Sequence, residues 1–348
     1  MRRTSTVLLV VVALLLVIGA TACGEASQES LAGEDQSPQA IIAATMTASE
    51  TMTEATGSFD VALTFDADTS DMPDEAKAFV DEPVSVSGTF GYVNEPRAGD
   101  FAIKLSLAGE TIDVGMKLIE NKLWLSMLDQ WYEAPAEMEQ TMAQSFDQQT
   151  QLEELKTLLG ELGVDPVTWF KDLRLVGEES IDGADAYHLA GSPDMARMMA
   201  DVVGLMQSEE FMNIVDPSGT ITQSMGAGEL APSPEDLQEM QTQLSQMLKD
   251  FTVDLWVGKE DSMMRKATAD LSIVPPAGEE TGGLNGIAVK ASISLADPEG
   301  ALEVEPPASA LPYGDLEKAM QENPEMFFGP LMGLMGGLGG YGTGGGSY

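Results

Sequence analysis

The stretch GSFDVALTF, residues 57–65, carries the pattern that decides the fold. Phe59, Val61, Leu63 and Phe65 alternate in it with polar or small residues. A side-chain period of two is typical of a β-strand with one apolar face. The same alternation recurs, between hairpin-sized turns, in PVSVSGTFGY (83–92), DFAIKLSL (100–107), TIDVGMKL (111–118) and KLWLSML (122–128). Successive short runs of this kind predict an antiparallel meander.

The middle of the chain changes to helical periodicity and then returns to strands. Apolar stripes predict helices in SPDMARMMADVVGLM (192–206), with Ser192 as N-cap, and in SPEDLQEMQTQLSQMLKDF (233–251), with Ser233 as N-cap. Asp182-Gly183 predicts a two-residue hairpin turn. Strand patterns resume in TVDLWVG (252–258), KATADLSIV (266–274) and GIAVKASISL (286–295). The order predicts an α+β fold, in which a single large curved antiparallel sheet holds helices against its concave face.

The N-terminus has the layout of an export signal. Met1-Arg2-Arg3 precedes the apolar run VLLVVVALLLVI (7–18), which is short for a membrane span, and small residues follow it up to Ala22. The order Ala20-Thr21-Ala22-Cys23 resembles the lipobox of bacterial lipoproteins, with Ala20 where leucine is usual. That resemblance implies cleavage of a signal peptide at residues 1–22 and a diacylglyceryl anchor, with chains such as palmitate, on Cys23. An ordinary secretory signal with a chance cysteine is the alternative.

Composition limits the classes of function. The chain has 348 residues, one cysteine and a formal net charge of −40. A single cysteine excludes disulfides within the chain and sites with several thiolate ligands. So negative a chain argues against nucleic-acid partners, whose phosphates need cationic contacts. We interpret the acidic surface as a solubilising one.

Four segments are expected after the signal peptide. Residues 23–37 are polar and predict a tether, and Ser37 with Pro38 marks the start of a first helix. Residues 38–312 form one predicted domain, with a loose insert at 208–232. Residues 313–348 form a predicted low-complexity tail rich in glycine and methionine. Its apolar character predicts that it contacts another surface.

The order of these elements is similar to that of mycobacterial lipoprotein carriers of the LprG/LppX type, and of the periplasmic carrier LolA. It is carried by GSFDVALTF, by LWLSMLDQWYEAP (123–135) and by IDGADAYHLAG (181–191), over roughly Ser37 to Pro307. The resemblance implies a half-barrel whose helices enclose an apolar cavity for acyl chains. It also implies transport of a lipid or lipoglycan through the envelope. The 208–232 insert and the tail depart from that pattern.

On this reading, alternating strand residues and the methionine-rich helix stripes line the cavity. Methionine adapts to contents of variable shape, although a plastic but filled core is the competing interpretation. The expected lining residues are Phe59, Val61, Leu63, Phe90, Ile103, Leu105, Val114, Met116, Leu125, Met127, Met198, Met199, Val202 and Leu244.

Catalytic and metal-binding chemistry has little support in the sequence. His188 is the only histidine in the sequence. It alternates with Tyr187 and Leu189 along a predicted strand, so we expect its side chain at the surface or at a rim. DADTSDMPDE (66–75) resembles a calcium loop but has Asp71 at its sixth position, where glycine is needed. Thioether copper sites usually need histidines as well. We therefore expect no enzyme activity, cofactor or metal.

The sequence thus predicts a lipid-anchored protein on the outer face of the membrane of a bacterium, of Gram-positive or actinobacterial type. Its predicted ligand is a lipid or lipoglycan. The alternative is a structural or sensory surface lipoprotein with a filled core, acting through protein contacts.

Overall fold

The structure is a computed structural model, and it describes residues 36–49, 52–70, 72, 74–127, 129–146, 158–206, 208, 210–211, 242, 246–275, 283–296 and 302–322. Cys23, Leu244, Ser233, nearly all of the 208–232 insert and the chain beyond Glu322 lie outside the described residues. Contacts divide the chain into two compact units. Unit 1 comprises residues 1–52 and 145–267, and unit 2 comprises residues 53–144 and 268–348.

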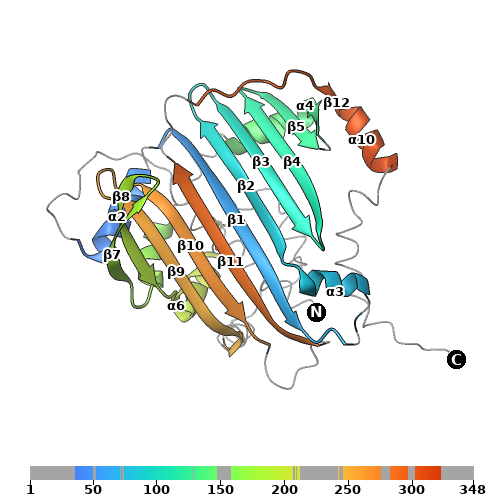
Figure 1. Ribbon diagram of the computed structural model, residues 1–348. Coiled ribbons are helices and arrows are strands. Elements are labelled where there is room, and N and C mark those ends of the chain that lie inside the picture. The colour runs from blue at the N-terminus through green and yellow to red at the C-terminus, as the bar shows by residue number, and fades with distance from the viewer. Residues whose placement is uncertain are drawn as a thin grey trace. The chain divides into compact units, whose positions relative to one another are not determined.

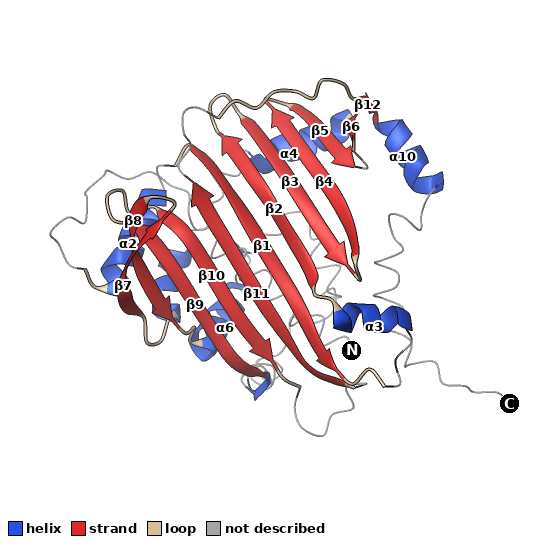
Figure 2. Ribbon diagram, in the orientation of Figure 1, coloured by secondary structure: helices blue, strands red, loops and turns tan. Residues whose placement is uncertain are grey.

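Twelve strands form one sheet, in the order β12-β6-β5-β4-β3-β2-β1-β11-β10-β9-β8-β7 (Figures 1 and 2). The α+β class and the single, almost entirely antiparallel sheet are confirmed. The strands are β1 (Glu54–Ala67), β2 (Val84–Val93), β3 (Ala98–Leu107), β4 (Glu110–Ile119), β5 (Lys122–Met127), β6 (Gln130–Glu133), β7 (Arg174–Ile181), β8 (Ala184–Gly191), β9 (Leu248–Gly258), β10 (Met264–Ile273), β11 (Leu284–Ala296) and β12 (Leu311–Pro312).

Unit 2 is built on the predicted meander. Strands β1 to β6 pair in sequence order, and β11 pairs antiparallel with the free side of β1, so the early and late strand runs meet as expected (Figure 1). Its helices are α3 (Asp74–Asp81), α4 (Ala136–Phe146) and α10 (Tyr313–Glu322). Glu139 of α4 accepts a hydrogen bond from the Leu123 amide at the start of β5. This bond holds α4 beside β5.

Unit 1 has a filled core. Its helices are α2 (Pro38–Ser49), the 3-10 turn η1 (Pro166–Trp169) and α6 (Met195–Met206). Ile41 of α2 packs with Leu189 of β8 and Val257 of β9, and all three are fully buried. Met198 of α6 packs in the same manner against Trp169 of η1. Apolar stripes on these helices therefore pack against the apolar side of their own strands.

Local sequence signals succeed where the interaction is local. The predicted cap Ser37 accepts a hydrogen bond from the Ala40 amide. Asp182 and Gly183, both at positive φ, form the predicted turn between β7 and β8. Both predictions are confirmed, because each depends on residues fewer than four apart.

Two predicted helix limits are wrong. The cap of α6 is Asp194, whose carboxylate accepts from the Arg197 amide, whereas the Ser192 carbonyl accepts from the Lys171 amide. The predicted helix at 233–251 runs too far, since β9 begins at Leu248. In both places a long-range strand or bridge contact overrides the local pattern. The sequence patterns do not predict helix α3 or the short strands β6 and β12.

Within the described ranges, no helix combines the length and the hydropathy needed to cross a membrane.

Two glycines of the β7–β8 hairpin test the turn. A Cβ atom added to Gly183 or to Gly177 would meet no other described atom within 4 Å, but only Gly183 has a positive φ, of 89°. We expect Gly183→Ala to lower the free energy of unfolding by about 1 to 2 kcal/mol, since an L-residue is strained there. Gly177→Ala should be neutral or slightly stabilising in the same urea titration. Equal effects of the two changes would contradict the turn geometry.

Candidate functional site: an apolar sheet face

Strand register brings the predicted strand residues onto one face of unit 2. Phe59 of β1 lies opposite Ile293 of β11 and Gly88 of β2. Gly88 in turn opposes Ile103, and Ile103 opposes Val114. The row continues to Met127 of β5. Because side chains alternate along a strand, the residues two positions away share this face, which we call the apolar face.

Three parallel rows make up the middle of the apolar face. Each row crosses from β11 to β4 or further, and no member carries a charge. The rows are Leu295, Gly57, Phe90, Phe101, Met116 and Leu125; Ile293, Phe59, Gly88, Ile103, Val114 and Met127; and Ala291, Val61, Val86, Leu105 and Ile112.

The opposite face of the same strands is polar and solvent-exposed. Ser58, Thr89 and Ala102 form a cross-strand row on that face and are exposed. Lys104 pairs there with Asp113 at 3.6 Å. The sequence prediction of one apolar and one polar face therefore holds across the meander.

Burial along the apolar face is uneven. At one end Leu118 and Leu123 are 0% and 1% exposed, and at the other end Leu107 and Val289 are buried. The side chains of the three middle rows are only half-buried, and Ile103, at their centre, is 38% exposed. In a filled core the middle of a wide sheet would be its most buried part. Residues at both ends are thus more buried than the middle, although Leu63 and Val84 at the second end are half-buried as well.

Glycines flatten the middle of this face. A Cβ atom on Gly88 would lie 2.8 Å from the Phe59 ring, and one on Gly57 would lie 2.7 Å from the Phe90 ring. Each phenyl ring thus reaches across to the neighbouring strand and occupies the space of the missing side chain. The sequence shows these glycines, but their pairing with phenylalanines depends on register.

An uncharged surface of this kind suits a hydrocarbon ligand. Its width across six strands is about 24 Å, at about 4.8 Å per strand spacing. Continuous apolar surface of several hundred Å² is uncommon on a protein unless something binds there. Each methylene transferred from water to such a surface gains about 0.8 kcal/mol.

The predicted lining residues belong to both units. The ten strand residues, from Phe59 to Met127, lie on the apolar face. Met198, Met199 and Val202 are on α6 in unit 1, where Met198 belongs to the filled cluster with Trp169. Leu244 lies outside the described residues. Val86 and Ile112 also lie on the apolar face, although the predicted lining set does not include them. They follow the same period-two alternation as the predicted residues.

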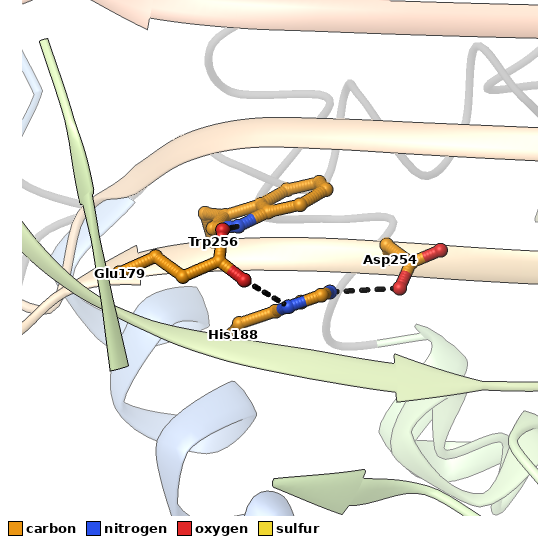
Figure 3. Close-up of polar contacts among 4 residues, drawn as sticks. All are labelled: Glu179, His188, Asp254 and Trp256. Carbon is orange, nitrogen blue, oxygen red and sulfur yellow. Dashed lines mark hydrogen bonds and ion pairs between the residues drawn. The ribbon is translucent and has the colours of Figure 1, made fainter. Parts of the chain in front are cut away.

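His188 is the centre of a polar cluster in unit 1 (Figure 3). Its Nδ1 lies 2.8 Å from Glu179 of β7, and its Nε2 lies 2.8 Å from Asp254 of β9. The ring stacks on Trp256 with centroids 4.4 Å apart, and the Trp256 indole N–H donates to Glu179. Alternation is as predicted, since Tyr187 and Leu189 face the core, but the His188 side chain is only 13% exposed.

This cluster has the character of a structural network. Both imidazole nitrogens are engaged by carboxylates, so neither is free to take a proton from a substrate. Lys266 adds a cation 5.0 Å above the Trp256 ring. The Asp182-Gly183 turn could have indicated that Glu179 lies near His188, but no local signal links either residue to Asp254.

Of three comparisons with known proteins, the one with solved structures finds similar chains. No family model matches the sequence, and no curated protein matches it. Among solved structures it is similar to the lipoprotein LppX of Mycobacterium tuberculosis, with 12% identity, a TM-score of 0.33, and 78% of this chain and all of that chain covered. LprF of Mycobacterium bovis gives 13% identity and a TM-score of 0.34, with 78% and 97% covered.

A putative outer-membrane lipoprotein-sorting domain of Vibrio parahaemolyticus is also similar, at 7% identity and a TM-score of 0.18. The alignment covers 76% of this chain and 92% of that domain.

Two matched truncations test the uneven burial. We expect Leu118→Ala to lower the free energy of unfolding by about 2 to 5 kcal/mol, because it removes a fully buried side chain. Ile103→Ala, on the same face, should cost less than about 1.5 kcal/mol, because its site is partly open. Urea unfolding of the ligand-free protein provides the measurement. Equal large losses would mean that the middle of the face is packed.

The His188 cluster predicts a pH dependence of stability. The Trp256 N–H, and after it His188, hold the pKa of Glu179 below its ordinary range. A lowered folded-state pKa adds stability above the unfolded value of about 4.3, and this stability is lost as pH falls through the folded value. Glu179→Gln should therefore lower the urea midpoint at pH 7, and the deficit should shrink below about pH 4. Glu260→Gln, at an exposed turn, is the control. A deficit independent of pH would contradict this role.

Proposed function

We propose that this chain is an extracytoplasmic, non-enzymatic lipoprotein that binds acyl chains of a lipid or lipoglycan against the apolar face of unit 2. The observation that carries the proposal is the half-buried middle of that face, which lies between more deeply buried residues at both ends. Transport of the ligand through the envelope is the role that such binding would serve.

The energetics favour a site of this size. A chain of about sixteen carbons gains roughly 12 kcal/mol on leaving water, at about 0.8 kcal/mol per methylene. A carrier must offer comparable apolar surface to extract such a chain from a membrane. The three middle rows provide that surface without a charged or hydrogen-bonding group that would need to be desolvated.

The lipobox-like segment supplies the location. A diacylglyceryl group on Cys23 would hold the protein on the outer face of the cell membrane, since two acyl chains anchor stably where one does not. Residues 24–37 would then separate the folded units from the bilayer. The envelope of an actinobacterium, with lipids on both sides of its wall, is the proposed setting.

A charge placed on either face tests the acyl site. Ile103→Asp puts a carboxylate into the middle of the apolar face, and Ala102→Asp puts the same group on the exposed opposite face. We expect Ile103→Asp to weaken binding of a fluorescent fatty acid at least about tenfold, or 1.4 kcal/mol, because the carboxylate must be desolvated. Ala102→Asp should bind as the wild type does.

Native mass spectrometry of the full chain, produced in an actinobacterial host, reports ligand and anchor together. We expect co-purified lipid, and a mature mass that begins at a diacylglyceryl-modified Cys23. Empty spectra, with equal fatty-acid binding by the two aspartate variants, would instead favour a surface lipoprotein that acts through protein contacts.

A further inference from the structure

We propose that the polar face of unit 2 binds an uncharged saccharide beside the indole ring of Trp131. This face is the side of the sheet opposite to the apolar face, so the proposal does not depend on the acyl site. We call the binding surface the tryptophan patch. Its members are Asp100, Ala102 and Lys104 of β3, Asp113, Gly115 and Lys117 of β4, Trp124 and Ser126 of β5, and Trp131 of β6.

Two tryptophans lie together on a face that is otherwise made of small and polar residues. Strands β1 to β4 present mainly serine, threonine, alanine, glycine and charged side chains there. Trp131 is opposite Ser126, and Trp124 is two positions away from Ser126 on the same strand, so the two indoles occupy diagonal positions of adjacent strands. Both are half-buried. The chain has four tryptophans, and half of them are therefore on this one polar surface.

The indole of Trp131 reaches across β5 to β4. A Cβ atom added to Gly115 would lie 3.2 Å from Cη2 of the Trp131 ring, so glycine leaves the room that the ring occupies. Beyond Gly115 the same cross-strand row continues with Ala102 and Thr89, which are short and exposed. A ligand can therefore lie on these short side chains and contact the indole at the same time.

Two ion pairs flank this open position along the strands. Lys117 lies 3.3 Å from Asp100 on one side of the Ala102–Gly115 pair, and Lys104 lies 3.6 Å from Asp113 on the other side. Asp100 and Lys104 are four residues apart, which is about 14 Å along a strand. The side chains of Lys104 and Asp113 are 56% and 65% exposed, so they can contact a ligand. This length accommodates a short run of sugar rings.

The chemistry of the patch matches that of a sugar. Each sugar hydroxyl both donates and accepts a hydrogen bond, whereas an ammonium group only donates and a carboxylate only accepts. A lysine–aspartate pair can therefore satisfy neighbouring hydroxyls, through hydrogen bonds that are strengthened by charge. The C–H groups of a sugar ring form an apolar surface that packs on an aromatic ring. An indole beside two ion pairs offers both kinds of contact.

The local charge favours an uncharged ligand. The chain as a whole has a formal net charge of −40, but the charged side chains that β3 and β4 place on the polar face are two lysines and two aspartates, which balance. An anionic polymer would be repelled by the chain as a whole. A purely apolar ligand would remove water from the ion pairs without replacing its hydrogen bonds. A neutral saccharide has neither disadvantage.

Affinity electrophoresis of the full chain tests the patch. The gels contain dextran, a mannan or a galactan, and a gel with anionic hyaluronan serves for comparison. We expect retardation by at least one neutral polysaccharide. Trp131→Ala should weaken that binding at least about tenfold, and Asp113→Asn about threefold to tenfold. Asp270→Asn is the matched control, because it alters the exposed pair of Lys290 with Asp270, 3.7 Å apart on other strands, and should have no effect.

Three results would overturn the saccharide proposal. These are retardation in none of the neutral gels, retardation in hyaluronan alone, and retardation that Trp131→Ala leaves unchanged.

Two adjacent residues separate this proposal from the acyl site. Ala102→Asp adds an unbalanced charge beside the indole, so we expect it to weaken saccharide binding at least about tenfold and to leave fatty-acid binding unchanged. Ile103→Asp should do the reverse. Since each variant keeps one kind of binding, loss of the other cannot come from unfolding. Saccharide binding that survives Ala102→Asp would contradict the patch, whereas absent fatty-acid binding alone would contradict only the acyl site.

Discussion

The register of β1 with β2 and β11 is the constraint on which the rest of unit 2 depends. Each of its strands has an apolar residue at every second position, but alternation alone gives narrow stripes. Only the pairing of Phe59 with Gly88 and Ile293 joins these stripes into continuous rows. A slip by one residue would turn half of every row to the polar side. One wide uncharged surface is therefore a property of the pairing.

Both units have apolar strand residues, but these residues are buried to different degrees. In unit 1 the stripe of α2 meets the strands, and Ile41, Leu189 and Val257 lose all contact with water. In unit 2 equally apolar strands keep Ile103 38% exposed, although Leu118 and Leu107 on the same face are buried. Stability does not require this arrangement, because covering the middle rows would release further hydrophobic free energy. The half-burial of the middle rows is therefore not explained by stability alone.

Most of the sheet could be predicted from the sequence, because its signals are local. Period-two alternation located the meander strands, and Asp182-Gly183 fixed a hairpin. Three features differ from the predictions. Leu248 lies in a helical sequence pattern but is the first residue of β9. Asp194, and not Ser192, caps α6. Helix α3 forms within the segment that was predicted as an acidic turn. At Ser192 the partner is the Lys171 amide, which is distant in sequence, and no local pattern reports it.

For the candidate site, too, the strand residues could be predicted from a local pattern and the helix residues could not. The ten strand residues of the expected lining share a face because a period of two survives any antiparallel pairing in correct register. The expected helix residues Met198, Met199 and Val202 belong to α6 of unit 1, and an apolar stripe specifies that a helix is buried but not against which strands. Met198 illustrates this: its stripe is satisfied by Trp169, a residue of its own unit. The methionine-rich stripe of α6 is thus accounted for by packing within unit 1.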